Sequence, residues 1–158
     1  MSIKLLIQAE LARIHSQGGV GRLEVDTGRG RLVCQLAAVD GIGCALETFV
    51  YQTDKLAGAT MDQLKKLSDA LTSKLNYLLE PITPLEADAE SCTVQCRSSP
   101  PQQGDDGRSY YELLVRRGGE VALCRFHKKP GQPRQVIPAE VTRQVLERLA
   151  ADFAAVVG

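Results

Sequence analysis

A basic stretch in the last third of the chain contains the residue types that most readily suggest chemistry. It reads VRRGGEVALCRFHKK over residues 115–129, with arginines, a histidine and lysines around a Gly-Gly pair. Guanidinium and ammonium groups that converge on one point bind phosphate or carboxylate groups. The candidate anion-binding residues of this stretch and the segment after it are Arg116, Arg117, Arg125, His127, Lys128, Lys129 and Arg134.

The same stretch also has the pattern of a β-hairpin with one wet face. Gly118 and Gly119 are typical of a tight turn between two antiparallel strands. A two-residue turn at this pair would place Glu112 opposite Arg125 on the face that meets water. The charges would then alternate outward because antiparallel sheets commonly have one solvated face. The sequence leaves both interpretations open: an anion-binding surface, or the solvent side of a hairpin.

Other combinations of reactive residues are less favourable. Cys124, His127 and Glu112 have the side chains of a nucleophile, a base and an orienting acid, but Cys124 and His127 alternate to opposite faces of one strand. Cys92 and Cys96 are not followed by a second Cys or His pair at zinc-ligand spacing. Aromatic residues make up only 4% of the chain, which is poor material for stacking on nucleic-acid bases. The sequence therefore predicts a non-catalytic protein without a metal or cofactor, and nucleic-acid binding is supported by the basic stretch alone.

The composition is typical of a globular domain without a membrane segment. The chain has 158 residues, of which 44% are hydrophobic, and 19 Lys and Arg balance 19 Asp and Glu. This length fits a single domain over residues 1–158, and the balanced charge creates no general attraction to nucleic acid or membranes. The apolar residues of the N-terminus are interrupted by charged ones, which fits neither a signal peptide nor a membrane span. An odd count of five cysteines suggests reduced thiols, so we expect a cytoplasmic protein.

The hydrophobic periodicity predicts an α+β domain with the order α-βββ-α-βββ-α, in which antiparallel strands pack on helices. The predicted elements are a helix over residues 2–16, strands over about 20–52, a helix from Thr60, strands from about 89 and a helix from Pro138. Thr60 and Gln63 have the spacing of a capping box, which marks a helix start. Pro138 suits the first turn of a helix. A polar segment rich in Pro and Gly, residues 98–107, is expected to be a loop.

Two segments of the chain resemble one another. Residues 30–49 align with residues 107–126 without a gap, and seven of the twenty positions are identical, where average amino-acid usage gives roughly one. The identical pairs are Gly30/Gly107, Arg31/Arg108, Leu36/Leu113, Gly41/Gly118, Ala45/Ala122, Leu46/Leu123 and Phe49/Phe126. The alignment predicts a duplicated β-β-β-α unit, with pseudo-repeats over about 20–78 and 89–156. A chance similarity of two hairpins is the alternative.

The two copies differ on the sheet face that the alignment places outside. In the first copy this face is mainly apolar and consists of Val33, Ala37, Val39, Cys44, Leu46 and Val50. Soluble monomers seldom expose a contiguous apolar patch of this kind. We therefore expect it to be covered, most simply by a second copy in a homodimer, or else by a different protein partner or by the first helix of the chain. Glu47 falls in a core-facing position of the first copy, and we expect it to reach solvent because Glu is almost never buried unpaired.

The order of elements resembles that of type III secretion chaperones. These are small cytoplasmic proteins, usually dimers, that hold segments of partner proteins in an extended state. The resemblance covers the whole chain, but it concerns element order without a shared motif, so it assigns no functional residue. It implies a non-catalytic, chaperone-like module that binds a protein partner or a second copy of itself. The alternative is the binding of an anionic ligand or nucleic acid through the basic hairpin at 116–134.

Overall fold

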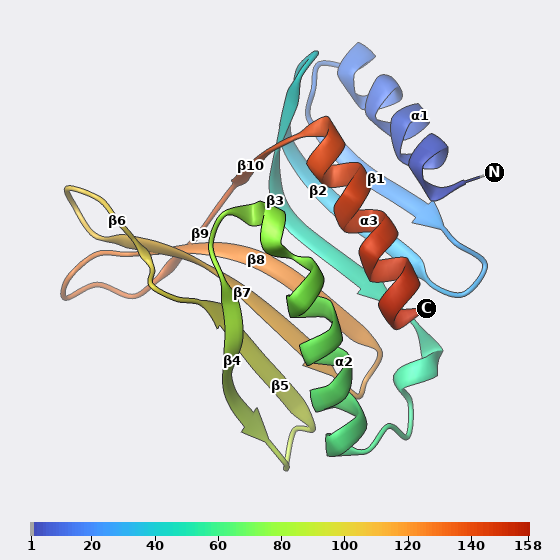
Figure 1. Cartoon of the computed structure of the whole chain (residues 1–158). Coiled ribbons are helices and arrows are strands. Elements are labelled where there is room, and N and C mark those ends of the chain that lie inside the picture. The colour runs from blue at the N-terminus through green and yellow to red at the C-terminus, as the bar shows by residue number, and fades with distance from the viewer. Residues whose placement is uncertain (1) are drawn as a thin grey trace.

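The structure is a computed structural model that describes residues 2–158, and it contains three helices and one antiparallel sheet of ten strands (Figure 1). This confirms the α+β class. The helices are α1 (Ile3–Ser16), α2 (Met61–Lys74) and α3 (Arg143–Val157), with short 3-10 turns η1 (Asp54–Leu56) and η2 (Asn76–Leu78). The strands are β1 (Gly21–Asp26), β2 (Arg31–Val39), β3 (Gly43–Gln52), β4 (Ile82–Asp88), β5 (Thr93–Ser98), β6 (Gln102–Gln103), β7 (Arg108–Arg116), β8 (Glu120–Lys128), β9 (Gln135–Ile137) and β10 (Ala139–Thr142).

The sheet joins the two halves of the chain at its centre. The strand order is β1-β2-β3-β8-β7-β5-β4, so β3 of the first half lies beside β8 of the second. Three shorter strands lie off this path: β6 pairs with β7, β9 with β8 and β10 with β3. Outward from the centre, β3-β2-β1 on one side corresponds to β8-β7-β5 on the other. A duplicated unit would have this arrangement, although the duplication itself stays a prediction about ancestry.

All three helices lie on one face of the sheet (Figure 1). The first helix has the predicted amphipathic pattern, and Ile7, Leu11 and Ile14 are fully buried. In α3, the Phe153 ring packs edge-on against Phe49 of β3, with 4.8 Å between the ring centroids. Removal of these apolar side chains from water is the main stabilising contribution to the fold. The opposite sheet face, called the outer face below, has none of the described helices on it.

The second helix begins as predicted. The Thr60 backbone N–H donates to the Gln63 side-chain oxygen at 2.9 Å, and the Gln63 backbone N–H donates to the Thr60 hydroxyl at 3.2 Å. These two bonds form the capping box. They satisfy two backbone donors that the first turn of a helix would otherwise leave without a partner.

The prediction that the last helix starts at Pro138 was wrong. Helix α3 begins at Arg143, where the Thr142 hydroxyl accepts from the Val145 backbone N–H at 3.1 Å. Strands β3 and β8 pair only over residues 49–52 and 120–123 and then diverge. The segment 135–142 lies along both diverging strands, as β9 beside β8 and as β10 beside β3. Backbone groups of a sheet need hydrogen-bond partners, and this pairing uses residues that the sequence pattern had placed in the helix.

The far ends of β7 and β8 project beyond the helices (Figure 1). Together with β6 and β9 they form an arm, which we define as residues 102–109 and 126–136. The polar loop predicted over residues 98–107 contributes to it, because Gln102 and Gln103 pair with Ser109 and Arg108.

Candidate functional site

The register of the β7–β8 hairpin decides where its charged residues point. Val115 lies opposite Val121, so the connection is a three-residue loop over 117–119 rather than the expected two-residue turn. Gly119 has a φ of +105°, and its N–H donates to the Arg116 carbonyl at 3.1 Å. Three-residue loops between hairpin strands commonly contain a glycine with a positive φ. The extra residue shifts the register by one position, and such a shift moves every side chain of β8 to the other face.

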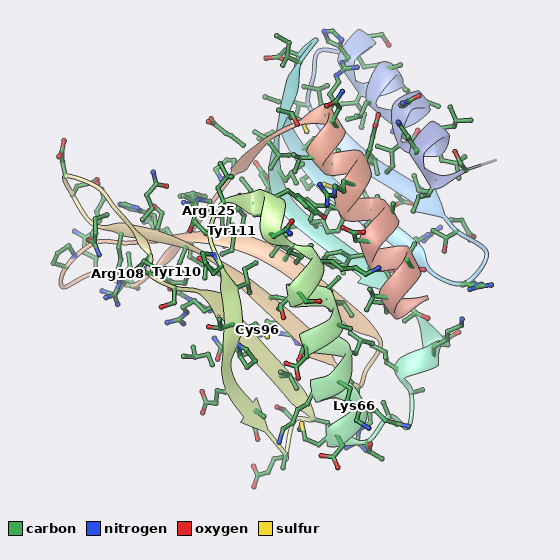
Figure 2. All side chains as sticks on the ribbon, viewed as in Figure 1. Lys66, Cys96, Arg108, Tyr110, Tyr111 and Arg125 are labelled. Atoms are coloured by element: carbon green, nitrogen blue, oxygen red, sulfur yellow. The ribbon has the colours of Figure 1, made fainter. Side chains whose placement is uncertain are left out.

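This shift corrects the predicted pairing. Glu112 lies opposite Cys124, not Arg125. Arg125 lies opposite Tyr111 and is buried on the helix side of the sheet. Figure 2 shows Arg125 and Tyr111 together near the end of α2, and the guanidinium lies over the Tyr111 ring at 4.6 Å. The hairpin therefore has a buried charged residue on each face of the sheet, Glu112 on one and Arg125 on the other. The sequence had predicted charged residues on a single face that meets water.

The seven residues proposed to bind an anion are not brought together. Arg134 lies over the outer face with its guanidinium 3.8 Å from the centre of the Phe126 ring, whereas Arg125 is on the opposite face. Arg116 and Arg117 are at the hairpin turn, at the other end from Lys128 and Lys129. Most of these charges already have acidic neighbours. These pairs are Arg116 with Glu120 at 3.7 Å, Arg125 with Glu80 at 2.8 Å, His127 with Asp106 at 3.2 Å, Lys129 with Asp106 at 3.7 Å, and Arg134 with Glu112 at 2.5 Å.

A buried carboxylate, Glu112, organises the polar part of the outer face. Its side chain is only 3% exposed. It accepts from Arg134 Nη1 at 2.5 Å and from Gln95 Nε2 at 2.8 Å, and Arg97 Nη2 lies 3.6 Å from the same oxygen, Oε2. Burial alone would raise the pKa of Glu112, but the hydrogen bonds from Arg134 and Gln95 and the nearby charges outweigh it and lower that pKa. Glu112 is therefore ionised in the folded protein at neutral pH.

This lowered pKa gives a pH-dependent contribution to stability. A carboxyl group whose folded pKa is lowered stabilises the fold fully above its unfolded pKa, near 4.5, and that stabilisation is lost as the pH falls through the folded value. We expect the difference in unfolding free energy between the parent protein and Glu112→Gln to shrink as the pH is lowered below about 4.5. Urea denaturation at pH 7 and at several acidic values measures this. A difference that stays constant, or grows, on acidification would contradict the assignment.

A hollow of about 690 Å³ lies on the helix side where the arm meets the sheet. Arg125 Nη1 donates to Glu80 at 2.8 Å and Nη2 donates to the Gln102 side chain at 2.8 Å within it. Leu79 at its edge is 90% exposed and has a φ of +65°. Positive φ is uncommon for a leucine and costs roughly 1 kcal/mol or more. The sequence pattern gave no sign of this groove, because Glu80 and Arg125 are 45 residues apart.

A Ser-His-Asp series lies on the arm. Ser109 Oγ is 2.8 Å from His127 Nδ1, and Asp106 Oδ1 is 3.2 Å from His127 Nε2. Acyl-transfer sites with these three groups also need preorganised donors for the oxyanion. Ser109 lies inside the sheet, between Gln102 and His127, rather than on a turn that leaves backbone N–H groups free. Asp106 is also 65% exposed. We therefore assign the series no catalytic role.

Two adjacent bulges change the predicted apolar face of the first half. Glu47 in β3 and Ala37 in β2 have no cross-strand partner, and the register shifts at both positions. Each bulge reverses the alternation of side chains beyond it. As a result Val39, Cys44 and Leu46 point into the core and are at most 7% exposed, which corrects their placement on the outer face. Glu47 is exposed, as expected, because it is the bulge residue of β3.

Of the remaining three predicted residues, Ala37 is the half-buried bulge residue of β2, whereas Val33 and Val50 belong to a continuous row across the outer face. Val33 lies opposite Val50, Val50 opposite Ala122, and Ala122 opposite Leu114. We call Val33, Val50, Ala122 and Leu114 the apolar row. They are half-buried, whereas their neighbours along each strand are buried against the helices. Glu24 and Gln95 continue the row at its two ends.

Three further features limit the chemistry. All five cysteines are free, and burial raises the pKa of Cys44 and of Cys96 to about 11, so these two thiols are protonated at neutral pH. Within residues 2–158, no cluster of His, Cys, Asp and Glu could hold a metal ion. The described helices are also too short and too polar to cross a membrane.

No model of a known protein family matches the chain, and no curated protein or solved structure matches it either.

Proposed function

We propose that this protein is a non-catalytic binding module that associates with a second copy of itself through the outer face of its sheet. The apolar row is the observation that carries the proposal. It crosses the four central strands without a charged residue, and no helix among the described residues lies on that face (Figure 1). Apolar surface of this kind is favourable to remove from water.

The charged residues around the row favour a second copy of the chain over a partner protein whose surface charges are all of one sign. The next cross-strand row includes Arg31 opposite Gln52, Gln52 opposite Glu120, and the Arg116–Glu120 ion pair. Both signs are therefore present beside the row. The whole chain has a formal net charge of zero, so two copies do not repel one another through a net field. An isologous contact requires a patch that complements itself, which a balanced rim permits.

The row is narrow, so a reversible dimer is expected rather than a permanent one. Leu114→Lys would place a charge in the contact while leaving the core residues of β7 unchanged. We expect the parent protein to dimerise with a Kd in the micromolar range, about −8 kcal/mol, and the variant to be a folded monomer. Sedimentation velocity over a range of protein concentrations, with circular dichroism as a check on folding, measures both.

The control is Ser73→Lys, which adds the same charge on the exposed side of α2. It should dimerise as the parent does. A parent that stays monomeric at 100-fold the expected Kd, or a folded Leu114→Lys variant with unchanged dimerisation, would rule out this contact.

Other features of the sequence interpretation stay predictions. Chaperone-like capture of an extended partner segment and a cytoplasmic location rest on element order and composition alone. The alternative, in which residues 116–134 bind an anion or nucleic acid, has lost its main support because those cations face two sides and two ends of the hairpin.

A further inference from the structure

A small pocket of about 290 Å³ lies at the outer face, away from the apolar row and next to the arm. It is formed by β4, β5, β7 and the segment that follows β5. Its polar lining consists of two arginines, Arg97 and Arg108, with Tyr110, Thr83, Ser98 and Ser99, and its apolar walls are Leu85 and Pro101. No carboxylate is among the residues that line it.

The positive charge of Arg97 is incompletely neutralised. Its nearest acid, Glu112, already accepts hydrogen bonds from Arg134 and Gln95, and Arg97 Nη2 is 3.6 Å from Glu112 Oε2. The single negative charge of Glu112 is thus shared between Arg97 and Arg134. In addition, Arg97 Nε is the one buried side-chain nitrogen or oxygen in residues 2–158 that has no hydrogen-bond partner. A guanidinium with unused donors is a favourable partner for a further anion.

Arg108 provides a second cation at the same pocket. It is exposed, and within the described chain no acidic group lies within ion-pair distance of its guanidinium. Arg108 and Tyr110 are two positions apart on β7, so both side chains point to the outer face. Figure 2 shows them beside each other along β7. Tyr110 is only 4% exposed, and the Arg97 guanidinium lies 4.5 Å from the centre of its ring.

We propose that this pocket binds a small organic carboxylate, with the carboxylate at Arg97 and Arg108 and an apolar or aromatic body against Leu85 and Pro101. Two guanidinium groups are suited to planar oxyanions. Leu85 is 54% exposed, so its apolar surface is available to a ligand. A pocket near the lower end of the usual size of ligand sites, roughly 300 Å³, fits a single-ring compound. None of the residues of the apolar row lines this pocket, so the proposal does not rest on the proposed dimer.

Benzoate is the probe, and the binding experiment uses the full chain. Nuclear magnetic resonance of the arginine Nε–H groups follows the titration. We expect saturable shifts at Arg97 and Arg108, and binding at least about tenfold weaker in Arg108→Gln. Because Arg108 is exposed, the variant should fold normally, which its amide spectrum verifies. The control is Arg31→Gln, which removes the same charge from the outer face on β2 and should leave the benzoate affinity within about twofold.

Two further compounds test the ligand class. Inorganic phosphate has the charge without the apolar body, and benzyl alcohol has the ring without the charge. Both should bind at least about tenfold more weakly than benzoate. Phosphate binding as tight as benzoate binding would overturn the organic part of the proposal. Shifts that never saturate, or an affinity equal in the parent and Arg108→Gln, would overturn the site itself.

Discussion

Leu46→Glu should prevent the protein from folding, whereas Val50→Glu, four residues further along the same strand, should leave the fold intact. Leu46 is 4% exposed and lies opposite Ala139 in the core, while Val50 is half-buried on the outer face. Truncation of a buried leucine alone costs about 2–5 kcal/mol, and a buried unpaired carboxylate adds to that. The sum is of the order of the whole stability of a typical domain. Val50→Glu should cost about 1 kcal/mol or less.

Circular dichroism and urea denaturation of the two variants distinguish the faces. The comparison is sharp because a strand without the bulge at Glu47 would place both residues on one face. A folded Leu46→Glu variant of near-parental stability would mean that β3 has no bulge at this position.

Glu112→Ala is expected to have the second largest effect, a loss of about 2–3 kcal/mol in unfolding free energy. Removal of one partner from a buried charged cluster costs about 3–5 kcal/mol because the opposite charge is left behind. The expected loss is smaller here because the Arg97 and Arg134 side chains are 33% and 38% exposed and can turn towards water. Urea denaturation at pH 7 measures it.

Glu120→Ala is the matched control for this loss. Glu120 also lies on the outer face and pairs with Arg116, but both side chains are 47% exposed. An exposed pair of this kind contributes less than about 1 kcal/mol. Equal losses in the two variants would show that the Glu112 cluster is no more stabilising than a surface ion pair.

Local sequence signals predicted the helical part of the fold well. The periodicity over residues 2–16 and the spacing of Thr60 and Gln63 act within a few residues of each other, so they could be interpreted without tertiary structure. The strand content and the α+β class followed from alternation in the same way. The start of α3 did not, because Pro138 is suited to a helix start and its actual role depends on the divergence of β3 and β8.

The candidate surfaces were harder to predict because each depends on a single-residue change of register. One extra residue in the 117–119 loop and one at Glu47 were enough to move Arg125 and Leu46 into buried positions. The alternation of residue types along a strand does not reveal such shifts, because apolar residues occur on both faces of this sheet. The pocket at Arg97 and Arg108 was missed for another reason. Its arginines are on different strands and stand in no common motif.

The most direct test of the proposed self-association is the detection of contacts between copies at the apolar row. A mixed sample of carbon-13-labelled and unlabelled protein allows nuclear Overhauser effects between copies to be observed selectively. We expect such effects among the methyl groups of Val33, Val50, Ala122 and Leu114, which form one row across the sheet. In a dimeric sample, effects between copies that involve only methyl groups elsewhere, such as those of the helices, would contradict an interface on the outer face.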